Sequence, residues 1–189
     1  MASEDYFSKY AEPFRTDLHF SRDYSADADR IVWTHIATIH DYEKHDTPED
    51  KQMDLAGYDR EIRLPRYGIR VRREKWITKA EFTVDIKEWA LKIKHPRKYY
   101  FFGYTSSIKH ALKFWMIFDY KKFKKLATEG KIKYGQETNR EHSAVDFLTF
   151  KIKDIFNHRL VLCYGGDKET IQQIVPKKFW GQQSLWRYW

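Results

Sequence analysis

Short segments with the alternating pattern of a β-strand occupy the middle of this chain of 189 residues. Residues 81–89 alternate apolar with polar side chains, so that one face of the strand would be apolar and the other charged. Residues 99–104 and 113–119 predict two more strands, rich in aromatic side chains and separated by a polar loop. Residues 59–64 and 69–77 flank a turn at residues 65–68 and predict a β-hairpin. The sequence therefore predicts a sheet of several short strands.

Helix signals stand before these strands. Asp27 can cap a first helix, and residues at helical spacing continue one face of it through Ile39 to Glu43. Residues 47–50 have the form of a second helix start, with threonine as the N-cap and proline at the first helical position. We expect this second helix to be short and to run through Met53.

The last part of the chain adds further strands and helices. Asp119 can cap a helix that Gly130 ends. Residues 147–152 and 160–164 predict strands, and residues 167–175 predict a helix that stops before Pro176. The predicted fold class is therefore α/β, with a mixed β-sheet flanked by α-helices.

The length of the chain is that of one ordinary domain, and 42% hydrophobic residues can fill a single core. Neither an internal repeat nor a Gly/Ser/Pro linker divides the sequence. We expect residues 1–26 to form an N-terminal arm, residues 27–126 the core, and residues 127–189 a C-terminal extension of the same domain.

Positive charge is distributed unevenly along the chain. The sequence holds 35 basic and 27 acidic residues, for a net charge of +8. Residues 1–59 carry 6 basic and 14 acidic side chains, whereas residues 60–189 carry 29 and 13. A basic body favours polyanionic partners, because each neutralised phosphate releases counterions. We therefore expect a nucleic-acid partner; a solvated, lysine-rich surface is the alternative.

The single cysteine, Cys163, cannot form an internal disulfide, and the first residues are polar and acidic. No segment approaches the apolar length of a membrane span. The sequence predicts a cytoplasmic protein, acting in the host cell if it is viral, with no membrane partner.

Carboxylates and basic residues gather between residues 41 and 87. Residues 50–52 are Asp-Lys-Gln, and residues 57–59 are Gly-Tyr-Asp at the start of a predicted strand. The next predicted strand contains residues 73–75, Arg-Glu-Lys. Over about residues 27–126 the chain resembles the PD-(D/E)xK nuclease superfamily. The resemblance implies a restriction-endonuclease-like fold and hydrolysis of phosphodiester bonds in DNA that depends on Mg²⁺ or Mn²⁺. A homodimer is among the assemblies compatible with it.

Asp59 and Glu74 are the metal ligands that this resemblance implies, and Lys75 is the residue that assists the attacking water. Carboxylates suit Mg²⁺, and a nearby lysine can stabilise developing charge. In the predicted hairpin the numbers of opposite residues sum to about 133 or 134, so Asp59 faces Glu74 or Lys75. Related nucleases often add an acid from a helix near the metal, and Glu43 is the candidate for that role.

The family pattern is not followed exactly in these segments. The acid normally stands two residues before the lysine, and here that position is Arg73. Glu74 and Lys75 would point to opposite faces of a regular strand. Residues 85–87, Asp-Ile-Lys, have the family spacing and offer Asp85 as an alternative metal ligand. A third alternative is a decayed metal site, with only binding retained.

Basic side chains near these acids are candidates for phosphate contacts. Lysines at positions 121–125 are more typical of a solvated helix face. Two rival functions stay open: a non-catalytic nucleic-acid-binding protein on the same fold, and a protein-interaction module whose acidic first third contacts a basic partner. The predicted nucleic-acid-binding residues are Arg70, Arg72, Arg73, Lys79 and Lys87.

Overall fold

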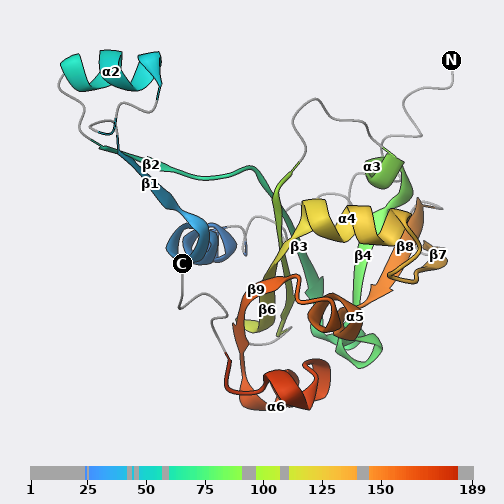
Figure 1. Ribbon diagram of the computed structural model, residues 1–189. Helices are drawn as coiled ribbons and strands as arrows, with labels where there is room; N and C mark the ends of the chain where they lie inside the picture. The colour runs from blue at the N-terminus through green and yellow to red at the C-terminus, as the bar shows by residue number, and fades with distance from the viewer. Residues whose placement is uncertain are drawn as a thin grey trace, which may run out of the picture.

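The computed structural model in Figure 1 describes residues 24, 26–41, 44, 47–56, 60–90, 97–106, 111–139 and 145–182. Its secondary structure is mixed, with strands and helices following one another along the chain. The elements are a helix over residues 26–36, β1 (Thr38–Asp41), α2 (Pro48–Leu55), β2 (Arg60–Arg63), β3 (Tyr67–Arg73), the 3₁₀ helix η2 (Glu74–Lys79), β4 (Glu81–Asp85), α3 (Ile86–Ala90), β5 (Tyr99–Thr105), β6 (Leu112–Asp119), α4 (Tyr120–Thr128), β7 (Gly135–Asn139), β8 (Val145–Lys151), α5 (Ile152–Asn157), β9 (Val161–Gly166), α6 (Lys168–Ile174) and η3 (Lys177–Phe179). The predicted α/β class, a mixed sheet with helices, is confirmed.

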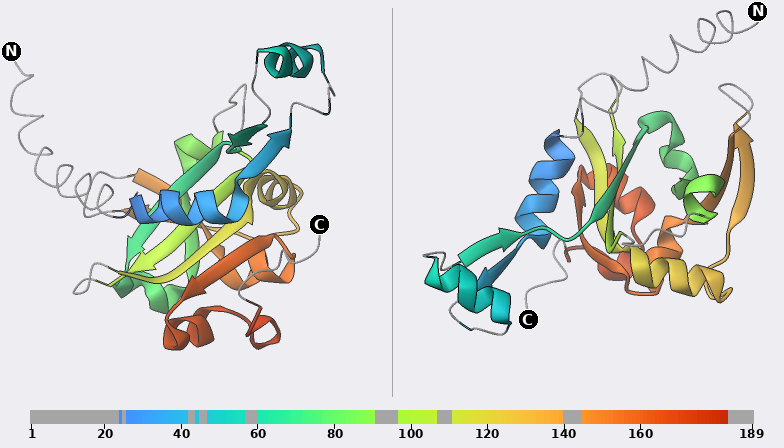
Figure 2. Two further views of the ribbon diagram at one scale, coloured as in Figure 1. Left: turned by 90° about the vertical axis from the view of Figure 1, so that its left-hand side faces the viewer. Right: turned by 90° about the horizontal axis from the view of Figure 1, so that it is seen from above.

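A four-stranded sheet in the order β3-β5-β6-β9 forms the centre of the fold. Strand β3 is parallel to β5, whereas β5, β6 and β9 are antiparallel neighbours, so the sheet is mixed. β3 is an edge strand of this sheet. Figure 2 shows a helix on one face of the sheet and further strands and helices on the other.

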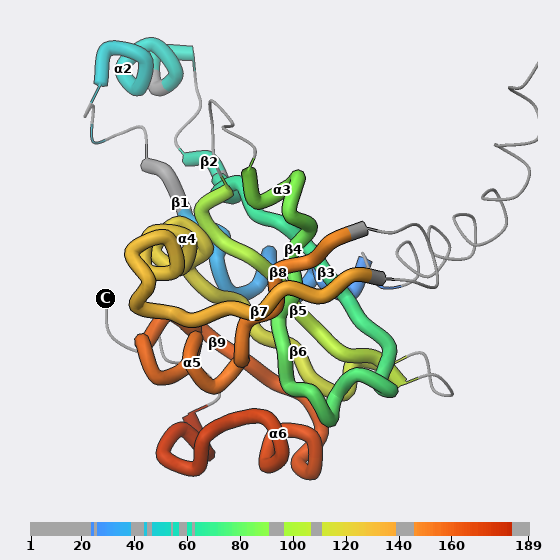
Figure 3. Tube along the Cα trace, turned by 90° about the vertical axis from the view of Figure 1, so that its right-hand side faces the viewer, coloured from blue at the N-terminus to red at the C-terminus, as the bar shows by residue number. Residues whose placement is uncertain are grey.

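One face of the central sheet carries the larger hydrophobic core. Even-numbered residues of β5 and β6, among them Phe102 and Phe118, point into it because side chains alternate along a strand. Opposite lies a second, antiparallel sheet in the order β4-β8-β7, visible in front of the central strands in Figure 3. Phe82 of β4 and Phe123 of α4 are fully buried between the layers.

The other face of the central sheet packs against the helix over residues 26–36. Ala28, Val32 and Ile36 share one side of that helix and form a second core with Phe101 and Ile117. The inner face predicted for this helix is therefore confirmed as far as Ile36.

The backbone beyond Ile36 leaves the predicted helix. Thr38–Asp41 form strand β1, which pairs with β2, so the prediction that the helix continues to Glu43 is wrong at Ile39. Glu43 itself lies outside the described residues. Helix α2 begins as predicted: the Thr47 hydroxyl accepts from the Asp50 amide at 3.1 Å, and the Asp50 carboxylate accepts from the Thr47 amide at 3.0 Å.

The predicted hairpin over residues 59–64 and 69–77 is wrong. β2 pairs with β1, and β3 pairs with β5 from Tyr67↔Tyr99 onward. The change of partner begins at Arg66, whose carbonyl oxygen already accepts from the Lys98 amide at 2.8 Å. Because β3 belongs to the central sheet, its apolar residues Ile69 and Val71 pack beside the second core, which a surface hairpin would not allow.

Two predicted strands are shorter than expected, and others are confirmed. The strand predicted over 69–77 ends at Arg73, and the one predicted over 81–89 ends at Asp85. The strands at 99–104 and 113–119, and the helices capped by Asp119 and Asp167, are present. Within the described residues, no helix combines the length and apolar character needed to cross a membrane.

Candidate nucleic-acid interface

The 3₁₀ helix η2 follows β3 without a loop and sets the geometry of the candidate site. A 3₁₀ helix has about three residues per turn, so residues three apart, such as Trp76 and Lys79, lie on one side. Ile77 is buried and Trp76 packs partly against the larger core, which fixes the turn to the domain. The helix ends at Ala80, whose left-handed backbone (φ 47°, ψ 52°) lets its amide donate to the Ile77 carbonyl at 2.9 Å.

Three cationic side chains surround the indole ring of Trp76. The Arg72 guanidinium lies 4.8 Å from the ring centroid, the Lys75 ammonium 5.3 Å and the Lys79 ammonium 5.1 Å. Each such contact contributes about 0.5–1 kcal/mol when exposed and about 2 kcal/mol when desolvated. We call Arg72, Lys75, Trp76 and Lys79 the Trp76 cluster; it holds positive charge on a ring that is anchored in the core.

Arg72 is the most buried cation of the Trp76 cluster. It lies opposite Tyr104 in the β3–β5 register. Burial lowers the pKa of the Arg72 guanidinium, and burial raises the pKa of Tyr104 to about 12. The Nη1 atom of Arg72 is buried without a hydrogen-bond partner in the described part of the chain. A buried donor in this state costs free energy unless a water or a ligand group accepts from it.

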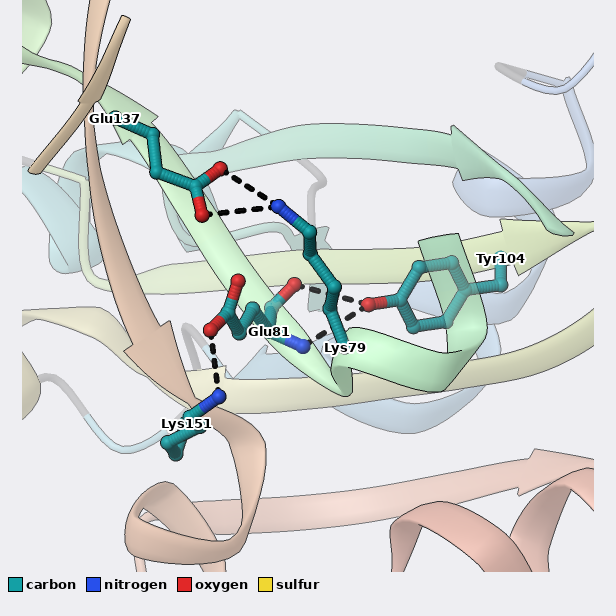
Figure 4. A network of polar contacts seen from close by, with 5 residues as sticks. All are labelled: Lys79, Glu81, Tyr104, Glu137 and Lys151. Atoms are coloured by element: carbon teal, nitrogen blue, oxygen red, sulfur yellow. Dashed lines mark hydrogen bonds and ion pairs between the residues drawn. The ribbon is translucent and has the colours of Figure 1, made fainter. Parts of the chain in front are cut away.

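A network of polar contacts ties η2 to the second sheet, as Figure 4 shows. The Tyr104 hydroxyl donates to the Glu81 carbonyl at 3.0 Å and accepts from the Glu81 amide at 3.1 Å. The Glu81 carboxylate accepts from Lys151 at 2.7 Å through Oε1, while its Oε2 is buried without a partner among the described residues. Lys79 donates to both carboxylate oxygens of Glu137, at 2.9 and 3.0 Å.

Arg70 lies two residues before Arg72 on the same face of β3, and it contacts a different aromatic ring and shares a carboxylate with Arg97. Its Nη2 atom is 3.6 Å from a carboxylate oxygen of Glu88 on α3, which also pairs with Arg97. The Arg70 guanidinium packs 5.7 Å from the ring centroid of Phe147. We therefore assign Arg70 a supporting position at the border of the Trp76 cluster.

The structure separates the predicted nucleic-acid-binding residues. Arg72 and Lys79 belong to the Trp76 cluster, and Arg73 is exposed at the end of β3 next to it. Lys87 is exposed on α3, at the far end of β4 from η2. On α4, ion pairs with Asp119 and Glu129 hold Lys122 and Lys125, as expected for a solvated helix face.

Of the predicted catalytic residues Asp59, Glu74 and Lys75, the structure describes the last two. Glu74 and Lys75 lie in η2 and not on a strand, so the assumed alternation of their side chains does not apply. The Glu74 carboxylate is 2.9 Å from the Lys113 ammonium, and this hydrogen bond and charge raise the pKa of Lys113. Asp59 lies outside the described residues.

The alternative motif at residues 85–87 is interrupted by a change of secondary structure. Asp85 ends β4, and its carboxylate accepts from the Lys87 amide at 2.6 Å at the start of α3. Asp85 and Glu81 stand at opposite ends of β4, about 13 Å apart at 3.3 Å per residue, and η2 adjoins the Glu81 end. No group of three or more His, Cys, Asp or Glu side chains able to hold a metal is present in the described ranges. Glu74 and Asp85, the two alternative partners of Asp59 in the predicted Mg²⁺ site, thus lie in different elements, η2 and the end of β4.

Sequence reasoning did not single out Trp76, Tyr104 or Glu137. Trp76 has a local signal, because basic residues stand four and one positions before it and three after it. Glu137 has none, since it follows Lys79 by 58 residues and meets it only through the pairing of β7 with β8 and β8 with β4.

Comparison of the chain with protein-family models, with curated proteins and with solved structures finds no significant match in any of the three.

Proposed function

We propose that this protein binds nucleic acid, with DNA as the expected partner, through the Trp76 cluster and the adjoining end of β3. The observation that carries this proposal is the arrangement of three cations around one core-anchored indole ring. Five of the ten residues from Arg70 to Lys79 are basic and one is acidic. A dense, partly rigid group of cations supports binding to a polyanion.

Contacts to phosphates, rather than to bases, are the mode that this geometry favours. The ring of Trp76 is shared between the core and the three cations, so stacking on a base would require these contacts to be given up. Lysine and arginine contacts to phosphate position a protein on nucleic acid without reading its sequence. We expect binding that depends strongly on salt and weakly on base sequence.

Removal of one exposed cation from the cluster tests the proposal. We expect Lys75→Gln to weaken binding to a DNA duplex by about five- to tenfold at low salt and to reduce the salt slope by about 1, because one phosphate contact is lost. Fluorescence anisotropy titrations over a series of salt concentrations measure both quantities. Lys121→Gln is the matched control, because Lys121 is an exposed lysine on α4 and its loss changes the net charge equally. Equal losses in the two variants, or no binding by the native chain at low salt, contradict the proposal. The second result favours a protein partner.

Metal-dependent hydrolysis of DNA on a restriction-endonuclease-like fold is the second candidate function. It rests on the resemblance of residues 50–52, Asp59 and residues 73–75 to the PD-(D/E)xK superfamily. The resemblance described above makes Asp59 the ligand on which such an activity depends. The described residues support no catalytic step, so this candidate rests on its own test.

That test compares the native chain with Asp59→Asn on plasmid and single-stranded DNA, in Mg²⁺, in Mn²⁺ and in EDTA. If the chain is a nuclease, cleavage requires the metal and falls by at least about a hundredfold in the variant, because a carboxylate ligand is lost. Binding in the presence of EDTA should be unchanged. Cleavage that persists in Asp59→Asn, or that is absent with every metal, rules out the activity.

A further inference from the structure

The carboxylate of Glu137 occupies an unusual position for an acid beside a nucleic-acid interface. It projects from β7, the edge strand of the second sheet, and both of its oxygens accept from the Lys79 ammonium. Its side chain is 47% exposed and that of Lys79 is 39% exposed. Exposed ion pairs of this kind are weak, so the carboxylate can be displaced by a stronger anion.

The negative charge of Glu137 also stabilises the charged form of Arg72. After burial, which lowers the pKa of the Arg72 guanidinium, the acids that raise this pKa include Glu81 and Glu137. Lys79 and Arg72 both contact the ring of Trp76, and Arg72 keeps one buried donor, Nη1, without a partner among the described residues. The Arg72 guanidinium thus adds positive potential beside the ion pair of Lys79 with Glu137.

We propose that Lys79 forms a phosphate subsite beside Arg72 and that the Glu137 carboxylate occupies this subsite in the free protein. A phosphate of the bound polyanion displaces Glu137 and accepts from Lys79, beside the positive charge of Arg72. Glu137 then lowers the affinity of the protein for the polyanion. This inference rests on the proposed nucleic-acid binding, whose affinity the ion pair of Lys79 with Glu137 lowers.

Glu137→Gln is the variant that tests the subsite. We expect it to bind a DNA duplex about fivefold more tightly than the native chain at low salt, because the competing charge is removed while the side chain keeps its size. Glu129→Gln is the matched control: it removes an exposed acid paired with Lys125 and Lys131 at the end of α4, with the same change in net charge. We expect less than a twofold effect from it. Should Glu137→Gln not fold, Glu137→Thr takes its place, because threonine suits an exposed strand.

A double-mutant cycle separates the subsite from a general effect of charge. If Glu137 acts by masking Lys79, the gain from Glu137→Gln disappears when Lys79→Gln is also present. A gain that is equally large without Lys79, or that Glu129→Gln reproduces, overturns the inference while the proposed function stands.

Inorganic phosphate tests the subsite without nucleic acid. If no form of the protein binds DNA, the proposed function fails, and the subsite is judged from the melting temperature in phosphate against chloride at equal ionic strength. Greater stabilisation of Glu137→Gln than of the native chain by phosphate supports the subsite. Equal stabilisation of the two proteins overturns it.

Discussion

Phe82→Ala is expected to lower the free energy of unfolding by about 3–5 kcal/mol, the usual cost of deleting a buried phenyl ring. Phe82 is fully buried on β4. Its ring centroid lies between 5.1 and 6.2 Å from those of five other aromatic residues, four of them edge-to-face. These neighbours come from β5, β6, α4 and β8, so they cannot collapse into the space without moving several elements. The cavity left behind therefore adds to the lost burial.

Urea denaturation followed by circular dichroism measures this loss. Leu55→Ala is the control, because Leu55 is 78% exposed on α2 and its removal should change stability by less than about 0.5 kcal/mol. A loss below about 1 kcal/mol for Phe82→Ala would mean that the two sheets do not pack through this ring.

Gly166→Ala is expected to be the second most damaging single change. Gly166 has a φ of +138°, which side chains rarely adopt, and a Cβ atom there would lie 2.2 Å from the Lys113 carbonyl oxygen. The backbone conformation costs about 1–3 kcal/mol, and an overlap with backbone atoms adds about 1–3 kcal/mol. Gly166 pairs with Phe114, so the strain would fall on the β6–β9 ladder of the central sheet.

Gly130→Ala separates these two contributions. Gly130 also has a positive φ, +72°, but a Cβ there would have nothing within 4 Å. We expect this variant to lose only the backbone part, about 1–2 kcal/mol, in the same thermal or urea unfolding experiment. Equal losses for the two glycines would contradict the overlap at Gly166.

The sequence predicts well those helices and strands that are determined by residues close to one another in the chain. The Asp119 carboxylate accepts from the Lys122 amide at 2.8 Å, and α4 ends near Gly130, as the local signals indicated. The aromatic strands β5 and β6 were also found, because their composition alone favours a buried strand.

Pairing between distant segments was not predictable from local patterns. The four residues 65–68, with proline and glycine, indicate a turn that would pair β2 with β3. In the structure β2 pairs with β1, and β3 pairs with β5, which begins about 30 residues later. The same limit applies to the strand ends. The chain leaves the strand at Glu74 and forms η2, because this turn lets Ile77 and Trp76 pack into the larger core. That core is formed by residues distant in the sequence.

The candidate site was predicted in part. Arg72 and Lys79 were selected from the basic composition of their segment, and both belong to the Trp76 cluster. The resemblance implies the catalytic pairing of Asp59 with Glu74, and the separate support from the hairpin register is lost because β2 and β3 do not pair. The acid that does contact the cluster, Glu137, belongs to the last third of the chain.

The pairing of β4 with β8 has a consequence for the folding of the chain during its synthesis on the ribosome. Glu81 of β4 pairs with Lys151, 70 residues later, and Phe82 pairs with Phe150. At about 5–20 residues per second, a ribosome needs several seconds to make the missing partner after β4 has been synthesised. In the last part of that time the aromatic strands β5 and β6 have been made, while β8 has not. We therefore expect the nascent chain to be a client of cellular chaperones until β8 has emerged.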